Sequence, residues 1–236
     1  MRLLLVSLKI AYLADREVYD ALGLRWEAPR VLQDEQPAWL EGIVPGSELD
    51  PCEDLECDVV VVGNGAGGGP VAATLAARGL GVLILEAGGH FTRSQFNGRP
   101  IEAMARMYVR PPTGMLLGNA LMPVPTGQTV GGSTTVNSGT CFRTPDDVLH
   151  GWGEAYGLTA LSPEAMAPWF EQVEHDIGVQ LAEWPHLGGP GRVIARGAEA
   201  LGLEHGPLLR NATGCDGQGV CCFGCPTDAK RSTNIT

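Results

Sequence analysis

The feature that most constrains this chain is a stretch that begins at Cys57 and reads CDVVVVGNGAGGGPVAATLAARGLGVLILEAGG. Residues 59–62 are a continuous β-branched run, which is typical of a strand buried on both faces of a parallel sheet. A glycine-rich turn, an Ala-rich helix and a second apolar strand follow over residues 63–69, 70–78 and 82–85. This order is a βαβ unit, so the sequence predicts an α/β fold built on a parallel sheet.

The G-x-G-x-x-G spacing after the first strand is the fingerprint of a dinucleotide-binding, Rossmann-type domain. Gly63 permits the tight turn, Gly65 lets the backbone approach a pyrophosphate, and Gly68 lets helix and strand pack closely. The carboxylate of Glu86, at the end of the second strand, can accept hydrogen bonds from an adenosine ribose and would disfavour a 2′-phosphate. The predicted cofactor-binding residues of this unit are Gly63, Gly65, Ala66, Gly67, Gly68 and Glu86. The fingerprint alone does not distinguish FAD from NAD, but no tyrosine stands four residues before a lysine, which argues against a short-chain dehydrogenase.

A second glycine loop covers residues 127–143 and reads GQTVGGSTTVNSGTCFR. Its paired glycines permit close backbone approach, and the hydroxyls and the Asn that follow can hydrogen-bond a polar ring edge. Taken alone, this loop fits a hairpin with a glycine turn. Its position after a dinucleotide fingerprint favours a role in the same cofactor site.

Three ordered motifs are VVVVGNGAGGG, LILEAGG and VGGSTTVNSGT, and they are followed by Trp152 and a helix ending WFEQVEHDIGV. In these features the chain resembles the glucose-methanol-choline (GMC) oxidoreductases, which are FAD-dependent alcohol oxidases and dehydrogenases. The resemblance spans about residues 57–236 and implies FAD as the cofactor. It further implies FAD contacts from the second loop at Gly131, Gly132, Ser133, Asn137 and Gly139. The chain departs from the family pattern at Gln128 and at Phe142, an aromatic that comes one position late.

The resemblance also implies a reaction, the oxidation of the CH–OH group of a small-molecule alcohol. In that family a base removes the hydroxyl proton while a hydride passes to flavin N5, and the base is usually a His near the C-terminus. The histidines of this chain all lie before that region, namely His90, His150, His175, His186 and His205. We therefore expect an N-terminal part of such an enzyme that is inactive by itself and whose catalytic residues are unknown. The electron acceptor, oxygen or a quinone or cytochrome, stays open.

The chain as a whole is expected to divide into two parts at about residue 50. Residues 1–50 are expected to form a helical leader and a linker, and residues 51–236 the N-terminal portion of the FAD-binding domain with the start of a substrate or cap region. Residues 90–150, rich in Gly, Pro and Thr, fit long functional loops. Helices are expected after Ser162, as N-cap, and over residues 192–201. The apolar positions that favour helices in the leader and after Ser162 are Leu4, Leu5, Leu8, Tyr12, Leu13, Trp169, Phe170 and Val173.

The cysteines are Cys52, Cys57, Cys141, Cys215, Cys221, Cys222 and Cys225. Three of them fall in GVCCFGCP, which resembles a segment of GMC members related to long-chain alcohol oxidases, including bacterial ones. The ligand count favours buried structural thiols, so no metal site is predicted. An iron–sulfur cluster, a disulfide and a zinc site remain alternatives. Two alternative functions follow. If the cysteines bind an iron–sulfur cluster, the chain would be an electron-transfer dehydrogenase subunit with FAD and that cluster. If it has no catalytic role, it would be a nucleotide-binding remnant.

Composition excludes some partners. The formal charge of −11 would repel the phosphate backbone of a nucleic acid. The N-terminal apolar stretch is interrupted by Lys9, followed by Asp15, and lacks a small-residue cleavage site, which favours an amphipathic helix over a signal peptide or a membrane span. The odd, uneven cysteine set favours a reducing cytoplasm.

Overall fold

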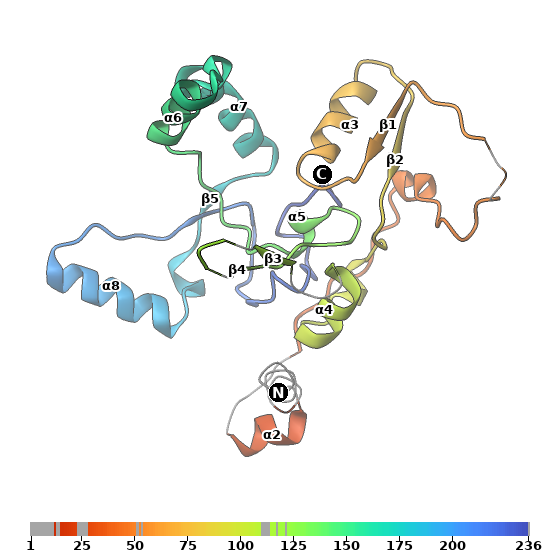
Figure 1. The fold of residues 1–236 in the computed structure, drawn as a ribbon. Helices are drawn as coiled ribbons and strands as arrows, with labels where there is room; N and C mark the ends of the chain where they lie inside the picture. Colours follow the sequence, from red (N-terminus) through yellow and green to blue (C-terminus); the bar gives the residue numbers. More distant parts are fainter. Residues whose placement is uncertain are drawn as a thin grey trace.

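The computed structural model describes residues 12, 15–22, 28–50, 52, 54–109, 114–116, 118–120 and 122–235. The predicted βαβ unit is confirmed. Strands β1 (Val59–Val62) and β2 (Val82–Leu85) pair in parallel, and α3 (Gly68–Ala76) connects them and packs on the sheet (Figure 1). These elements have the α/β, Rossmann-type arrangement that the sequence predicts.

The sheet is covered on one face. Helix α3 contacts both strands, and Val61 is only 9% exposed, but Val60 and Val62 are 51% and 84% exposed. The expectation of a strand buried on both faces is therefore wrong for the described residues, among which β1 pairs with β2 alone.

The middle of the chain is more regular than expected, because α4 (Pro100–Met107) forms within the predicted loops. Proline stands at its start, where the missing N–H is not needed. Its buried side chains Ala103 and Met107 pack with residues from other segments, and the resulting core cluster is Phe96, Ala103, Met107, Tyr108 and Val136. A short antiparallel hairpin follows, formed by β3 (Gly114–Leu116) and β4 (Met122–Val124).

Three helices follow in the chain, and in Figure 1 α6 (Asp146–Tyr156) and α7 (Pro163–Asp176) lie together while α8 (Gly189–Leu201) lies apart from them. The helix expected after Ser162 is confirmed as α7, and Ser162 Oγ accepts a hydrogen bond from Ala165 N at 3.3 Å. Its expected apolar stripe stays largely open, with Trp169 67% exposed. The helix expected over 192–201 is confirmed as α8. Strands β5 (Gln180–Leu181) and β6 (Leu209–Arg210) pair antiparallel beside these helices.

The N-terminal region is described in part. Helix α2 (Arg16–Ala21) is capped by Asp15, whose side chain accepts from Glu17 N at 2.9 Å. Most positions of the predicted leader helix, Leu4, Leu5, Leu8 and Leu13, lie outside the described residues. The boundary near residue 50 stays a prediction. In the described part of the chain, no helix has the length and apolar character needed to span a bilayer.

Candidate functional site

The glycine turn between β1 and α3 has the geometry that the fingerprint predicts. Gly63 has a φ of +85°, and its N–H donates to Leu85 O at 2.7 Å, which ties the turn to the end of β2. A Cβ at Gly68 would lie 1.8 Å from Gly63 O. Helix α3 can therefore begin this close to β1 only with glycine at that position.

The outer side of this turn is open backbone. Ala66 and Gly67 are exposed, and Gly67 is the N-cap of α3 without a side-chain hydrogen bond among the described residues. A Cβ at Gly67 would meet nothing within 4 Å, and one at Gly65 would meet only Gly132 Cα, at 3.8 Å. In the first turn of α3, the Gly69 N–H donates to Gly65 O at 3.0 Å and Pro70 has no N–H, so the N–H of Gly68 and the positive end of the helix dipole are what this turn offers to an anionic group.

The second glycine loop crosses the first backbone to backbone. Gly131 and Gly132 have φ values of +88° and +53°, and a Cβ at Gly132 would lie 2.9 Å from Gly65 Cα. The loop continues into α5 (Ser133–Val136), so it is not the hairpin that its sequence alone would fit. The structure therefore brings the two predicted glycine loops together into one site.

Asn64 joins the two loops, although the sequence did not single it out. Its side chain is 9% exposed, and its Oδ1 accepts from Gly131 N at 2.7 Å. Its own N–H donates to Glu86 Oε2 at 3.1 Å, and its carbonyl accepts from Thr233 Oγ1 at 2.6 Å. The signal available in the sequence was a polar residue between the first two glycines of the fingerprint.

Glu86 lies at the end of β2, where the sequence placed a ribose-binding carboxylate. Its two oxygens are held by main-chain N–H groups, Oε2 by Asn64 at 3.1 Å and Oε1 by Gly88 at 2.8 Å. Each carboxylate oxygen can accept a further hydrogen bond. The side chain is half-buried and fixed in direction, which suits an acceptor for a pair of hydroxyls.

The remaining predicted contacts of the second loop have different surroundings. Ser133 is exposed, and its Oγ accepts from Gly127 N at 3.0 Å. Asn137 is exposed at the end of α5, and its Oδ1 accepts from Gly139 N at 3.0 Å. Gly139 is buried with a φ of +71°, and a Cβ there would lie 2.9 Å from Asn211 Oδ1. Gly139 thus packs against protein, whereas Ser133 and Asn137 are accessible.

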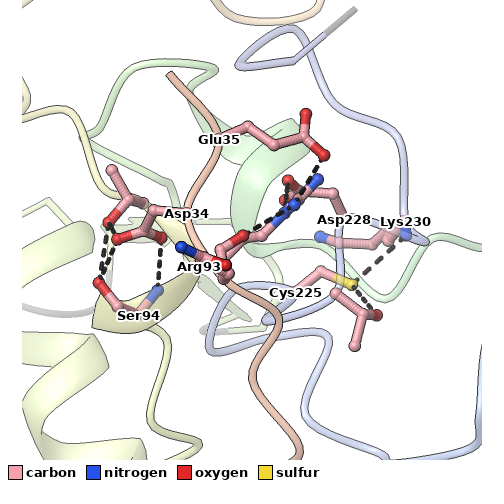
Figure 2. Close-up of polar contacts among 10 residues, drawn as sticks. Asp34, Glu35, Arg93, Ser94, Cys225, Asp228 and Lys230 are labelled. Atoms are coloured by element: carbon pink, nitrogen blue, oxygen red, sulfur yellow. Dashed lines mark hydrogen bonds and ion pairs between the residues drawn. The ribbon is translucent and has the colours of Figure 1, made fainter. Parts of the chain in front are cut away.

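A C-terminal segment, residues 225–235, packs beneath both loops. Lys230 is 2% exposed, and its Nζ donates to the carbonyls of Thr134, Thr135 and Asn137 at 3.1, 2.8 and 2.9 Å. Burial lowers the pKa of Lys230 to about 8. The Lys230 N–H also donates to Cys225 Sγ at 3.4 Å (Figure 2). The sequence contained no local signal for this role beyond the rarity of the residue type, since Lys230 and Lys9 are the two lysines of residues 1–236.

Residues 34 and 35, which belong to the predicted N-terminal linker, contact residues 93 and 94, and Arg93 in turn contacts the C-terminal segment 225–235. Arg93 forms ion pairs with Glu35, at 2.9 Å, and with Asp228, whose φ of +52° places it in the left-handed region (Figure 2). Asp34 accepts from Ser94 N at 2.9 Å and from Ser94 Oγ at 2.6 Å, and these bonds hold the pKa of Asp34 below its usual value. Burial raises the pKa of Asp228 although Arg93 opposes that shift.

A cavity of about 130 Å³ lies between this linker and the C-terminal segment. Asn234 lines it, and the Oδ1 of Asn234 is buried without a hydrogen-bond partner among the described residues. His90 also lines it, edge-on to Trp39, and burial lowers the pKa of His90. The other histidines are exposed at positions His150, His175, His186 and His205.

The seven cysteines are all present as free thiols. Cys221 Sγ lies 3.0 Å from Arg210 Nη2, and Cys225 lies against the Lys230 backbone. Within the described ranges, no three His, Cys, Asp or Glu side chains are placed to hold one metal ion.

A family model described as GMC oxidoreductase matches residues 59–236. An uncharacterised GMC-type oxidoreductase of Mycobacterium tuberculosis is 38% identical over 179 residues, which are 75% of this chain and 28% of the relative. A long-chain-alcohol oxidase of Arabidopsis thaliana is 35% identical over 182 residues, 77% of this chain and 24% of the relative.

A solved structure described as pyridoxine 4-oxidase from Mesorbium loti shares the fold, with a TM-score of 0.53 and 18% identity. The match covers 77% of this chain and 42% of that structure. The two sequence relatives described above are matched over 28% and 24% of their own length. This chain therefore corresponds to about a quarter of each.

Proposed function

This chain belongs to the GMC oxidoreductase family, and from that premise we propose that its two glycine loops hold FAD and that it serves the oxidation of an alcohol CH–OH group. FAD is the cofactor of this family, whose members are flavoenzymes. The similarity to a long-chain-alcohol oxidase supports an alcohol as the substrate class.

The contact between Gly65 and Gly132 is the observation that carries this proposal. A Cβ at Gly132 would lie 2.9 Å from Gly65 Cα, so two loops far apart in the sequence meet without side chains between them. Bare backbone with open space outside it is what a pyrophosphate needs for close approach. The residues present therefore fit FAD: the turn and the start of α3 would hold the pyrophosphate, and Glu86 the ribose.

FAD would supply the redox chemistry by accepting a hydride from the alcohol carbon. The residues of this chain would bind and orient the cofactor. The positive end of the α3 dipole would offset phosphate charge, and Glu86, fixed by the N–H groups of Asn64 and Gly88, would accept from ribose hydroxyls. The accessible side chains Ser133 and Asn137 would contact the cofactor from the second loop.

We further propose that the base that takes the hydroxyl proton is not among residues 1–236. Four of the five histidines are exposed and make no hydrogen bond to the glycine loops that the structure describes, while His90 lies in the cavity beside Trp39. The exposed sheet face at Val60 and Val62 supports the view that these residues are one part of a larger unit. The electron acceptor is oxygen or a quinone or cytochrome.

The test of cofactor binding is Gly65→Ala. A methyl group at this position would meet the protein only at 3.8 Å, an ordinary contact, so folding should be intact. The same methyl group would stand where the pyrophosphate approaches, so we expect FAD to bind at least about tenfold more weakly, a change of ~1.4 kcal/mol. Equilibrium dialysis with FAD and circular dichroism of each variant measure the two effects separately.

Gly197→Ala is the matched control, because a Cβ on this residue of α8 would meet nothing within 4 Å. It should leave both folding and FAD affinity unchanged. Unaltered FAD affinity in a folded Gly65→Ala protein would contradict the proposed site.

A further inference from the structure

We propose that Lys230 is a positioning residue for the flavin, acting through the end of α5 and Asn137. This inference rests on the proposed function, since it assumes that the second glycine loop contacts FAD. It extends that function by assigning a role to a buried cation that the glycine fingerprint does not include.

The ammonium group of Lys230 lies at the carbonyl end of helix α5. Its three N–H donors match three main-chain carbonyls, those of Thr134, Thr135 and Asn137, at 3.1, 2.8 and 2.9 Å. It also lies 3.3 Å from Asn137 Oδ1. A four-residue helix such as α5 leaves its last carbonyls without helical partners, and Lys230 satisfies them. The ammonium thus fixes both the helix end and the Asn137 side chain.

The end of the second glycine loop, which Lys230 holds, lies beside the proposed cofactor site. Helix α5 follows directly on Gly131 and Gly132, the residues that meet the first glycine turn. Ser133, its first residue, and Asn137, its C-cap, have exposed side chains that a ligand can reach. A cation at the carbonyl end of this short helix holds the whole loop in one conformation before the cofactor arrives, which lowers the ordering cost of binding.

The chemistry of position 230 suits a lysine better than an apolar side chain or an arginine. A buried ammonium without a carboxylate partner is costly, and burial lowers the pKa of Lys230 to about 8. The titratable groups around it are Cys221, Cys222 and Cys225, whose thiolate forms favour the ammonium, and Arg210, whose charge opposes it. A planar guanidinium would not match three converging carbonyls, whereas an ammonium does. Retaining so costly a charge points to a role that an apolar side chain cannot fill.

The test compares Lys230→Met with the wild-type protein, as its natural gene encodes it, after removal and re-addition of FAD. We expect Lys230→Met to weaken FAD binding at pH 7 by about tenfold or more. The wild-type affinity should fall as the pH rises from about 7 through 9.5, because the ammonium loses its proton, whereas the affinity of Lys230→Met should lack this component. Flavin fluorescence reports both quantities without any turnover. Arg196→Met, which removes an exposed cation from α8, should behave as wild type.

The outcomes separate the inference from the proposed function. A wild-type protein that binds no FAD would overturn both. Wild-type binding together with an unchanged affinity and pH profile in folded Lys230→Met would overturn the inference alone. If Lys230→Met does not fold, ¹³C-lysine spectra of the wild type decide, with the Lys230 signal identified by its low pKa of about 8. FAD should then raise the pKa of Lys230, and an unchanged titration would overturn the inference.

Discussion

At the scale of single residues, Asn64 is the point at which the two glycine loops depend on each other. Its Oδ1 receives the Gly131 N–H at 2.7 Å inside the protein. Asn64→Ala would leave that N–H buried without a partner, so we expect the free energy of unfolding to fall by about 1–3 kcal/mol. Urea denaturation measures this change. Gln172→Ala, which removes an exposed bond to Asp176, should change it by less than about 0.5 kcal/mol.

An Asn64→Ala protein as stable as Gln172→Ala would show that the loops are held by other contacts. The lost hydrogen bond lies within the protein itself, so the loss of stability should appear even in the absence of FAD. This distinguishes Asn64 from Gly65, where the expected loss concerns the cofactor alone.

The glycines of the fingerprint were predictable from sequence because the contacts that require glycine lie within a few residues of each other. Gly63 and Gly68 serve one turn between adjacent elements, and the spacing alone predicts them. Asn64 and Lys230 were not, because their partners lie 67 and 93–96 residues away in the chain. No local pattern encodes which distant carbonyl or N–H a polar side chain will meet.

At the scale of elements, the linker around Asp34 and Glu35 is tied to the C-terminal segment through Arg93. Arg93→Met would leave Asp228 largely buried, 18% exposed, without its ion-pair partner. We expect a loss of roughly 2–4 kcal/mol in the free energy of unfolding, somewhat less than for a fully buried pair. The linker should also detach, so that trypsin cleaves after Arg30 sooner in the variant than in the wild type. Urea denaturation and timed digestion measure the two effects.

Arg99→Met is the control for this element, because Arg99 and Glu102 form an ion pair whose side chains are 60% and 44% exposed. Such a pair contributes at most about 1 kcal/mol. Equal losses in Arg93→Met and Arg99→Met would mean that the Arg93 network does not hold the linker.

Elements with strong local signals were predicted, and those formed by distant contacts were not. Strands β1 and β2 and helix α7 follow from an apolar run, a turn or a cap within a few residues. Helix α4 lies in a stretch whose composition resembles loops, and its buried side chains meet Phe96 and Val136 from other segments. Tertiary packing therefore decides the structure there.

At the scale of the whole molecule, we propose that residues 1–236 bind FAD and that the catalytic base lies outside them. This predicts how residues 1–236 behave alone. With FAD bound, they should show no bleaching of the flavin band when mixed anaerobically with primary alcohols, sterols or sugars, because no base would take the hydroxyl proton. Dithionite, which needs no base, should bleach the same sample and serves as the control. Bleaching by any alcohol would place a base within these residues.

The hydrogen bond from Thr233 Oγ1 to Asn64 O spans 169 residues. During synthesis, the glycine turn therefore leaves the ribosome long before the residue that secures it. At about 5–20 residues per second the delay is roughly 10–30 s. Over that interval the βαβ unit can form locally, but Lys230 and Thr233 have not yet arrived beneath the loops. A ribosome that stalled before residue 230 would therefore present the nucleotide-binding fingerprint without the contacts that Lys230 and Thr233 make to the two loops.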